Sequence, residues 1–114
     1  MVVVDQLSAL RAAALASDQP GPKNAYAWEA LTCEPADLQD PDAALVFALE
    51  AVELGEWGDP DVMDTLALAY HRTGANIKAV EVEERALALI DEGDAARREP
   101  FEDALEEYRS ALEN

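Results

Sequence analysis

Basic residues are scarce in this sequence. It contains 8 Lys and Arg residues against 25 Asp and Glu residues, which gives a formal net charge of -17 at pH 7. Nucleic acids and anionic membranes repel such a chain, so we expect neither as a direct ligand. Between Asn24 and His71 there is no Lys or Arg at all. This charge favours a basic protein or peptide as partner, although a solvated acidic surface kept for solubility would have the same composition.

Cysteine, histidine and long apolar runs are also rare. Cys33 is the single cysteine and cannot form an internal disulfide, and it stands near an expected helix end, where the dipole disfavours a nucleophilic thiolate. His71 is the single histidine, which excludes a two-histidine metal site. The chain has no glycine-rich phosphate loop, no secretory signal and no run near the ~18 apolar residues of a membrane span. We expect a cytoplasmic protein with no catalytic residues, metal or cofactor.

The remaining sequence is rich in alanine and is patterned for helices. Asp40-Pro41 and Asp59-Pro60 each place an aspartate at a helix N-cap and a proline in the first turn. Gly74 is typical of a helix C-terminus. Apolar residues at helical spacing then predict helices over about 3–17, 23–33, 40–54, 59–73, 76–92 and 100–112. In this interpretation Pro20-Gly21-Pro22 ends the first helix and Pro100 opens the last one.

The third and fifth expected helices are related in sequence. Their apolar residues match at a constant offset of 35 (79 minus 44), and the helices before them match at an offset of 40 (67 minus 27). The matched pairs are Ala44 with Ala79, Leu45 with Val80, Ala51 with Ala86, Val52 with Leu87, Leu54 with Leu89, and Ala27 with Ala67. Two helix-turn-helix units are therefore expected to stack on each other.

Paired helices with this period resemble the tetratricopeptide repeat, in a divergent variant common in bacterial proteins. The residues that carry the resemblance, within about 24–90, are Met63, Leu66, Ala67 and Tyr70 of the first helix, Gly74 of the turn, and Ala79 and Ala86 of the second helix. Ala48 and Glu83 depart from the pattern because they stand where the second helix usually has an aromatic residue. Asp91 stands in place of the proline that usually ends the repeat.

The resemblance implies an all-α fold. We expect one domain, a short right-handed superhelix of about two repeats, at 23–55 and 59–92. Two repeats are fewer than the three or so usually needed for stability, so the helices at 1–18 and 99–113 are expected to act as caps.

The resemblance also implies a concave groove that binds a peptide, lined by the first helix of each pair. Carried over residue by residue, this surface comprises Asn24, Trp28, Leu31, Asp61, Asp64, Leu68, His71 and Arg72. Its apolar floor and acidic edge would suit a peptide with a Lys or Arg and one apolar anchor. The family's clamp for a C-terminal carboxylate is not expected, because Asp64 and Leu68 replace its cation and its amide.

Several of these interpretations have alternatives. Trp28 would also be explained by packing under the first helix. Trp57, in the loop between the two units, is expected either to be exposed for binding or to cover both units as a lid. For the whole chain, the leading hypothesis is a protein-binding adaptor or scaffold. The alternatives are a homo-oligomerisation module, such as a homodimer, and an acidic mimic of nucleic acid that occupies a basic protein surface.

Overall fold

A computed structural model describes residues 4–113, and within these residues every regular element is a helix. The elements are α1 (Val4–Ala16), α2 (Pro20–Thr32), the short 3-10 helix η1 (Ala36–Leu38), α3 (Pro41–Leu54), α4 (Pro60–Arg72), α5 (Asn76–Ala88) and α6 (Ala95–Leu112). The prediction of an all-helical chain is confirmed. Val3, where the first helix was expected to begin, lies outside the described residues.

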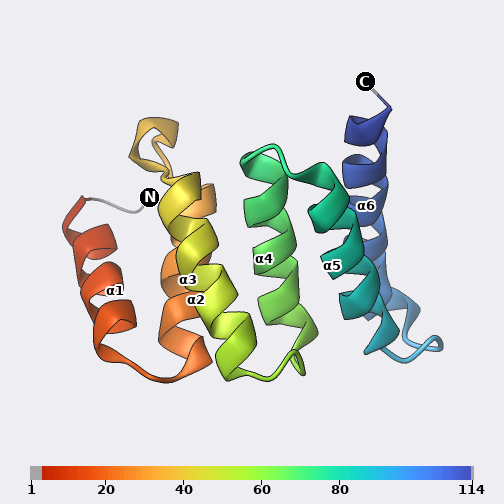
Figure 1. Ribbon diagram of the computed structural model, residues 1–114, viewed down its shortest axis with the longest axis horizontal. Helices are drawn as coiled ribbons and strands as arrows, with labels where there is room; N and C mark the ends of the chain where they lie inside the picture. The colour runs from red at the N-terminus through yellow and green to blue at the C-terminus, as the bar shows by residue number, and fades with distance from the viewer. Residues whose placement is uncertain (1–3, 114) are drawn as a thin grey trace.

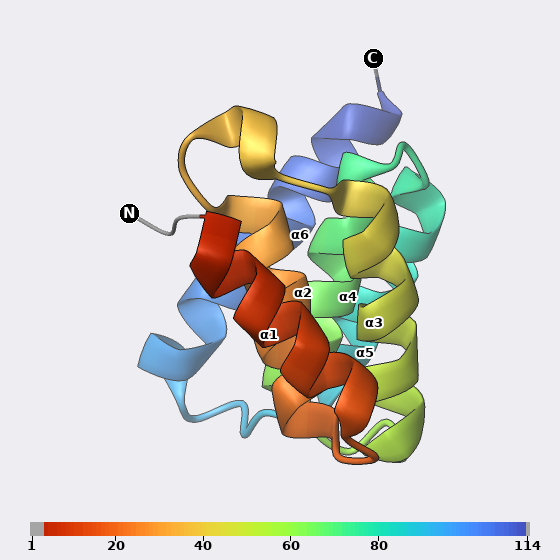
Figure 2. The same cartoon turned by 90° about the vertical axis from the view of Figure 1, so that its left-hand side faces the viewer.

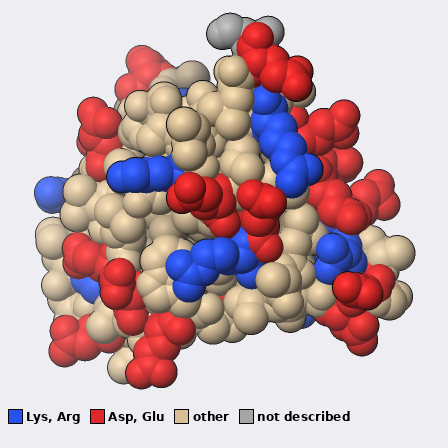
Figure 3. Space-filling view, turned by 45° about the vertical axis from the view of Figure 1, so that its right-hand side comes forward, with Lys and Arg blue, Asp and Glu red and all other residues tan. Residues whose placement is uncertain are grey.

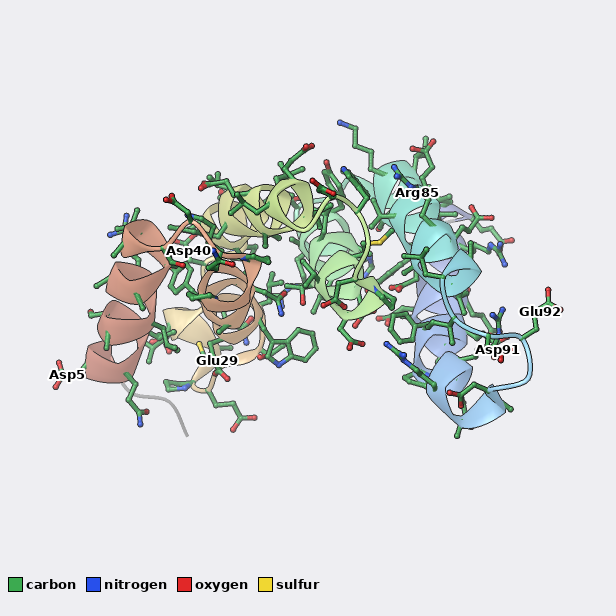
Figure 4. The ribbon with its side chains drawn as sticks, turned by 90° about the horizontal axis from the view of Figure 1, so that it is seen from below. Asp5, Glu29, Asp40, Arg85, Asp91 and Glu92 are labelled. Atoms are coloured by element: carbon green, nitrogen blue, oxygen red, sulfur yellow. The ribbon has the colours of Figure 1, made fainter. Side chains whose placement is uncertain are left out.

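The helices stand in a row that follows the chain from α1 at one end to α6 at the other (Figure 1). Each helix packs against the next one in sequence, and α2 also contacts α4. Seen from α1, the first helix lies in front of α2 (Figure 2). Seen from below, α3 and α5 form one side of the row, while α2, α4 and α6 form the other (Figure 4). The row therefore has two distinct faces.

The predicted starts of α3 and α4 are confirmed by their caps. The Asp40 carboxylate accepts a hydrogen bond from the backbone N–H of Ala43 at 3.1 Å, and Asp59 accepts one from Asp61 at 2.9 Å. Each bond satisfies a first-turn N–H that has no partner inside the helix. These two helices begin where they do because of local chemistry.

The expectation for Pro20-Gly21-Pro22 is wrong, because these residues form the first turn of α2 and do not merely end α1. The N–H groups of a first helical turn have no acceptor within the helix, so two prolines there remove no hydrogen bond. The fixed backbone angle of proline also suits this position.

The expected boundaries of α5 and α6 are also wrong. α5 ends at Ala88 instead of about Glu92, and α6 begins at Ala95, which places Pro100 inside the helix. Asp94 caps α6 by accepting a hydrogen bond from the backbone N–H of Arg97 at 3.2 Å. The charged segment before Pro100, which resembles a connector, is therefore the start of the helix.

The residues matched between α3 and α5 also have matching burial. Ala44 and Ala79 are both 0% exposed, while Leu54 and Leu89 are 43% and 50% exposed. The same offset aligns Ala48 with Glu83 (83 minus 48 is 35), and both are 0% exposed. The structure therefore puts a methyl group and a carboxyl group at matched buried positions.

Gly74, between α4 and α5, is needed for its backbone conformation. Its φ is +88°, a region that residues with a side chain rarely adopt, and no atom would obstruct an added Cβ. Gly74→Ala is therefore expected to lower the free energy of unfolding by about 1–2 kcal/mol through strain alone. Urea unfolding measures this loss. Gly21→Ala, which also meets no obstruction, is the control; equal stability of the two variants would contradict this reason.

Candidate functional site

An open groove lies between α4 and α6. Its volume is about 580 Å³. Helix α6 packs chiefly against α5, so the side of α6 that faces α4 is left largely uncovered and forms one wall of the groove. The lining residues are His71 of α4 and Asp103, Glu106, Glu107, Ser110 and Ala111 of α6. Because three of them are carboxylates, the groove attracts cations.

His71 is held in a defined orientation at the wall of this groove. Its ring lies against the ring of Tyr108, with 4.8 Å between the centroids. Nδ1 lies 2.6 Å from the Oδ1 atom of Asn76, and Nε2 lies 3.8 Å from the Glu107 carboxylate. An amide oxygen only accepts hydrogen bonds, so Nδ1 carries the proton and Nε2 is directed towards Glu107. His71 thus joins α4, α5 and α6.

A pair of carboxyl groups lies where the same three helices meet. Glu83 of α5 is 0% exposed, and no hydrogen-bond donor of the described residues reaches either of its carboxyl oxygens. Its carboxyl group interacts with that of Asp64, which is half-buried on α4. Both carboxyl groups interact electrostatically with the Tyr108 hydroxyl of α6. Two acceptors that face each other in a buried site are satisfied by sharing a proton.

The environment of this pair favours its protonated form. Burial, together with the Asp64 carboxyl, raises the pKa of Glu83 to about 10. Burial also raises the pKa of Asp64. The pKa of the Tyr108 hydroxyl is raised by burial and by the negative charges of Glu83 and Asp64. At neutral pH Glu83 is therefore an uncharged acid that donates a hydrogen bond to Asp64.

Glu83 was not predicted as a site residue, but one signal in the sequence pointed to it. It is a departure from the pattern of the family that the chain resembles, and its counterpart in the first unit is an alanine. Asn24 of α2 corresponds to Asp64 at the offset of 40 (64 minus 24), and its buried Oδ1 atom also has no donor within the described residues. The groove residues of α6 carried no signal, because that helix was interpreted as a cap.

The predicted groove residues of α2 and α4 are only partly brought together. Asp64, Leu68 and His71 follow one another at intervals of four and three on one face of α4. Trp28 is 42% exposed on α2. Leu31 is 1% exposed and belongs to the core. Because α2 packs against both α3 and α4, this position faces the interior and does not line a surface.

Two other predicted groove residues form contacts within the chain. The Arg72 guanidinium donates to the backbone oxygen of Leu31 and to the side-chain oxygen of Gln39, both at 2.7 Å. It thereby ties the end of α4 to the end of α2. The Asp61 carboxylate lies 3.6 Å from the Arg97 guanidinium at the start of α6. These contacts support the scaffold, and Asp61 remains exposed.

Trp57 lies away from the groove. The ring is half-buried against the core, and the Arg85 guanidinium lies 4.0 Å from its centroid. Arg85 lies on the α3 and α5 side of the row (Figure 4). The backbone turns through two consecutive positive φ angles, 55° at Glu56 and 59° at Trp57. This contact is worth about 0.5–2 kcal/mol and fixes the loop between α3 and α4.

Several basic residues bind the ends of other helices. Lys23 donates to the backbone oxygen of Ala14 at 2.9 Å, and Arg98 donates to those of Leu87 and Ile90 at 3.1 and 3.0 Å. Such carbonyls have no partner in their own helix and carry its negative dipole end. Lys23, Arg72 and Arg98 are thus committed to the scaffold. Acidic side chains are spread over the face that Figure 3 shows.

Comparisons with protein-family models, with curated proteins and with solved structures gave no match. Within residues 4–113, no group of three or more His, Cys, Asp or Glu residues is placed to hold a metal ion. In the same part of the chain, no helix is long and apolar enough to cross a membrane. The fold and the groove together define an acidic protein of consecutively packed helices.

Proposed function

We propose that this protein is a tetratricopeptide-like adaptor that binds a basic segment of a partner protein in the groove between α4 and α6. The observation that carries this proposal is a groove of about 580 Å³ lined by three carboxylates, in a chain whose net charge is -17. The matching burial of α3 and α5 supports the repeat architecture on which the proposal depends.

Charge and apolar surface have separate roles in this binding. The carboxylates of α6 draw a basic segment towards the groove, which speeds association and makes it sensitive to salt. Trp28 is exposed on α2 and supplies an apolar surface there. Helix α2 is in direct contact with α4, which forms one wall of the groove. An aromatic side chain of this size is the kind that dominates binding energy in protein interfaces.

Capture of a partner from the native cell extract tests the proposal. The wild type is compared with Trp28→Ala and with Glu106→Lys, which reverses a charge in the groove. The matched control is Glu53→Lys, an exposed charge reversal on α3. We expect the wild type and the control to recover the same protein, and Trp28→Ala and Glu106→Lys to recover about tenfold less. Equal recovery by all four proteins, each verified as folded by circular dichroism, would refute binding in the groove.

Salt separates the adaptor from a nucleic-acid mimic. A mimic binds through charge alone, and at ~1 M salt the Debye length falls to about 3 Å, so its complexes should dissociate. Binding through Trp28 as well as charge is expected to weaken as salt rises, but to persist. Complete loss of the complex at high salt, with Trp28→Ala behaving as wild type, would favour the mimic.

A second candidate function is self-association through the end of the row. Leu15 of α1 is 61% exposed on the terminal helix, where a further helix could stack. Mass measured by light scattering over a range of concentrations tests this candidate. If the wild type forms a homodimer through this end, the Leu15→Ser variant should be shifted towards the monomer. A wild type that stays monomeric at every concentration would exclude self-association.

A further inference from the structure

His71 and Glu107 turn two hydrogen-bond acceptors towards each other in the groove. The Nδ1 atom of His71 donates to the Asn76 side-chain oxygen at 2.6 Å, which leaves a lone pair on Nε2. Nε2 lies 3.8 Å from Oε1 of Glu107, which is too long for a direct hydrogen bond. Among residues 4–113 no donor is bonded to either atom. One donor group with two or more N–H bonds could bridge the two acceptors.

We propose that His71 and Glu107 together receive one cationic N–H group of the partner's side chains, and that a proton on His71 excludes this group. The inference rests on the proposed function and names the residues that hold the partner's charge. Lysine ammonium and arginine guanidinium groups each carry several N–H donors, so either can donate to Nε2 and to the carboxylate at once. The charge of Glu107 makes its bond stronger than one between neutral groups.

The position is accessible and one of its walls is fixed. Both residues line the groove of about 580 Å³. The His71 side chain is 21% exposed and is held by the Tyr108 ring and by Asn76, whereas the Glu107 side chain is 69% exposed. The ring therefore stays in place while the carboxylate can adjust to a ligand. Asn76 is a positioning residue, because its amide oxygen keeps the proton on Nδ1 and the lone pair on Nε2.

A proton on Nε2 removes this receptor. The imidazolium has no acceptor nitrogen, and it pairs with Glu107 in place of the partner's cation. Protons and the partner therefore compete, and each weakens the binding of the other by the same factor. Histidine side chains change charge between about pH 5 and 8. The affinity for a basic segment is expected to fall as the solution is acidified through this range.

The surroundings of His71 leave this competition to its own ring. The titratable groups that face it are Glu107, Tyr108, Asp103 and Glu106 of α6 and, through the Tyr108 hydroxyl, Asp64 and Glu83. From α5 it faces the uncharged amide of Asn76. Arg72 is bound to the end of α2, and Lys78 lies over an aromatic ring of α4. Of the residues that line the groove, His71 is the one that can gain a positive charge.

The signal of the single histidine reports this competition. NMR follows the His71 ring from pH 5 to 8 in the full chain, with and without acetyl-Lys-Gly-Lys amide at constant ionic strength. With this probe at about ten times its dissociation constant, we expect the midpoint of the ring titration to fall by about one pH unit. The affinity should be about five- to tenfold lower at pH 5.5 than at pH 7.5.

Two further peptides identify the chemistry that is recognised. The same peptide with both lysines trimethylated is the matched control, because its side chains keep their charge and have no N–H donor. A peptide with arginine in place of lysine shows which of the two cationic side chains fits better. An equal effect of the trimethylated peptide, or the absence of a saturable effect of both the lysine and the arginine peptide, would overturn the assignment.

Two variants, studied by calorimetry, locate the probe. Glu107→Gln should weaken binding of the lysine peptide about tenfold at pH 7.5, and this exposed change leaves the core intact. His71→Gln keeps a polar side chain that does not titrate, so the difference between pH 5.5 and 7.5 should disappear. Glu81→Gln, an exposed change on α5 outside the groove, is the control and should bind as wild type.

The outcomes separate this receptor from the proposed function. If His71→Gln and Glu107→Gln both behave as wild type while Glu106→Lys loses the peptide, the cation binds elsewhere in the groove. The assignment to His71 and Glu107 is then wrong, and the proposed function stands. If all of these variants bind the peptide equally and Trp28→Ala and Glu106→Lys also capture the partner normally, both proposals fail.

Discussion

Replacement of Glu83 by glutamine is expected to raise the free energy of unfolding by about 3 kcal/mol at pH 7. In the folded protein burial and Asp64 raise the pKa of Glu83 from 4.5 to about 10. At pH 7, about 2.5 units above the ordinary pKa of 4.5 for this group, the unfolded chain has lost the proton that the folded protein keeps. Keeping it costs about 1.4 kcal/mol of stability for each of these pH units. Glutamine is uncharged at every pH and donates the same hydrogen bond to Asp64, so it avoids this cost.

The sign of the pH dependence follows from proton binding. Between pH 4.5 and about 10 the folded state holds a proton on Glu83 that the unfolded chain has lost. Stability of the wild type therefore decreases as pH rises through this window, by up to about 1.4 kcal/mol per pH unit from this group. Below pH 4.5 both states are protonated, and the difference from Glu83→Gln should vanish.

Urea unfolding at pH 5, 7 and 9 measures this effect. The difference between the two proteins should be small at pH 5 and largest at pH 9. Glu81→Gln, at an exposed position, should change stability by less than about 0.5 kcal/mol throughout. A Glu83→Gln protein that is no more stable than wild type at pH 9 would show that burial does not keep this carboxyl protonated. A gain, by contrast, would mark Glu83 as a position at which stability is given up for function.

Replacement of Lys23 by alanine should lower the free energy of unfolding substantially. Its side chain is buried on α2, where it donates to the Ala14 backbone oxygen at the end of α1 and lies 3.1 Å from the Glu50 carboxylate of α3. The ammonium group is also 5.6 Å from the Phe47 ring centroid. Lys23→Ala leaves a buried carbonyl without a donor and removes a charged contact, so a loss of about 2–3 kcal/mol is expected.

Thermal and urea unfolding measure the loss, and hydrogen exchange locates it. Because α1 packs mainly against α2, its amides should lose protection before those of α4 and α5. Lys78→Ala is the control, since this exposed lysine contacts only the Tyr70 ring among the interactions of the described residues. Similar losses in both variants would show that the buried contacts of Lys23 contribute nothing specific.

The helix starts could be predicted where local chemistry fixes them. Asp40 and Asp59 cap α3 and α4 with bonds that span two or three residues, so the sequence alone indicates them. Pro20-Gly21-Pro22 and Pro100 were misinterpreted because the role of a proline is not fixed by its nearest neighbours alone. Whether a proline ends a helix, begins it or lies inside it depends on the chain before it, here on whether Asp94 caps a turn ahead of Pro100.

The candidate site was less predictable than the helices. The resemblance to the tetratricopeptide repeat predicted Asp64, Leu68 and His71 on one face of the helix, and their spacing agrees, because residues three and four apart share a face. It could not show that Leu31 is buried at 1% exposure, since this depends on where α2 and α4 meet. The same holds for Arg72, whose acceptor on Leu31 lies 41 residues away.

The scarcity of cations was determined by composition, and the proposal of a basic partner depends on the net charge that results from it. Helical content and the match between α3 and α5 were also determined by the sequence, because period and capping act within a few residues. Only the tertiary structure decided where the charges lie. Glu83 meets Asp64 and Tyr108 because three helices converge, and the loss of water at that point, not the residue type, keeps its carboxyl protonated.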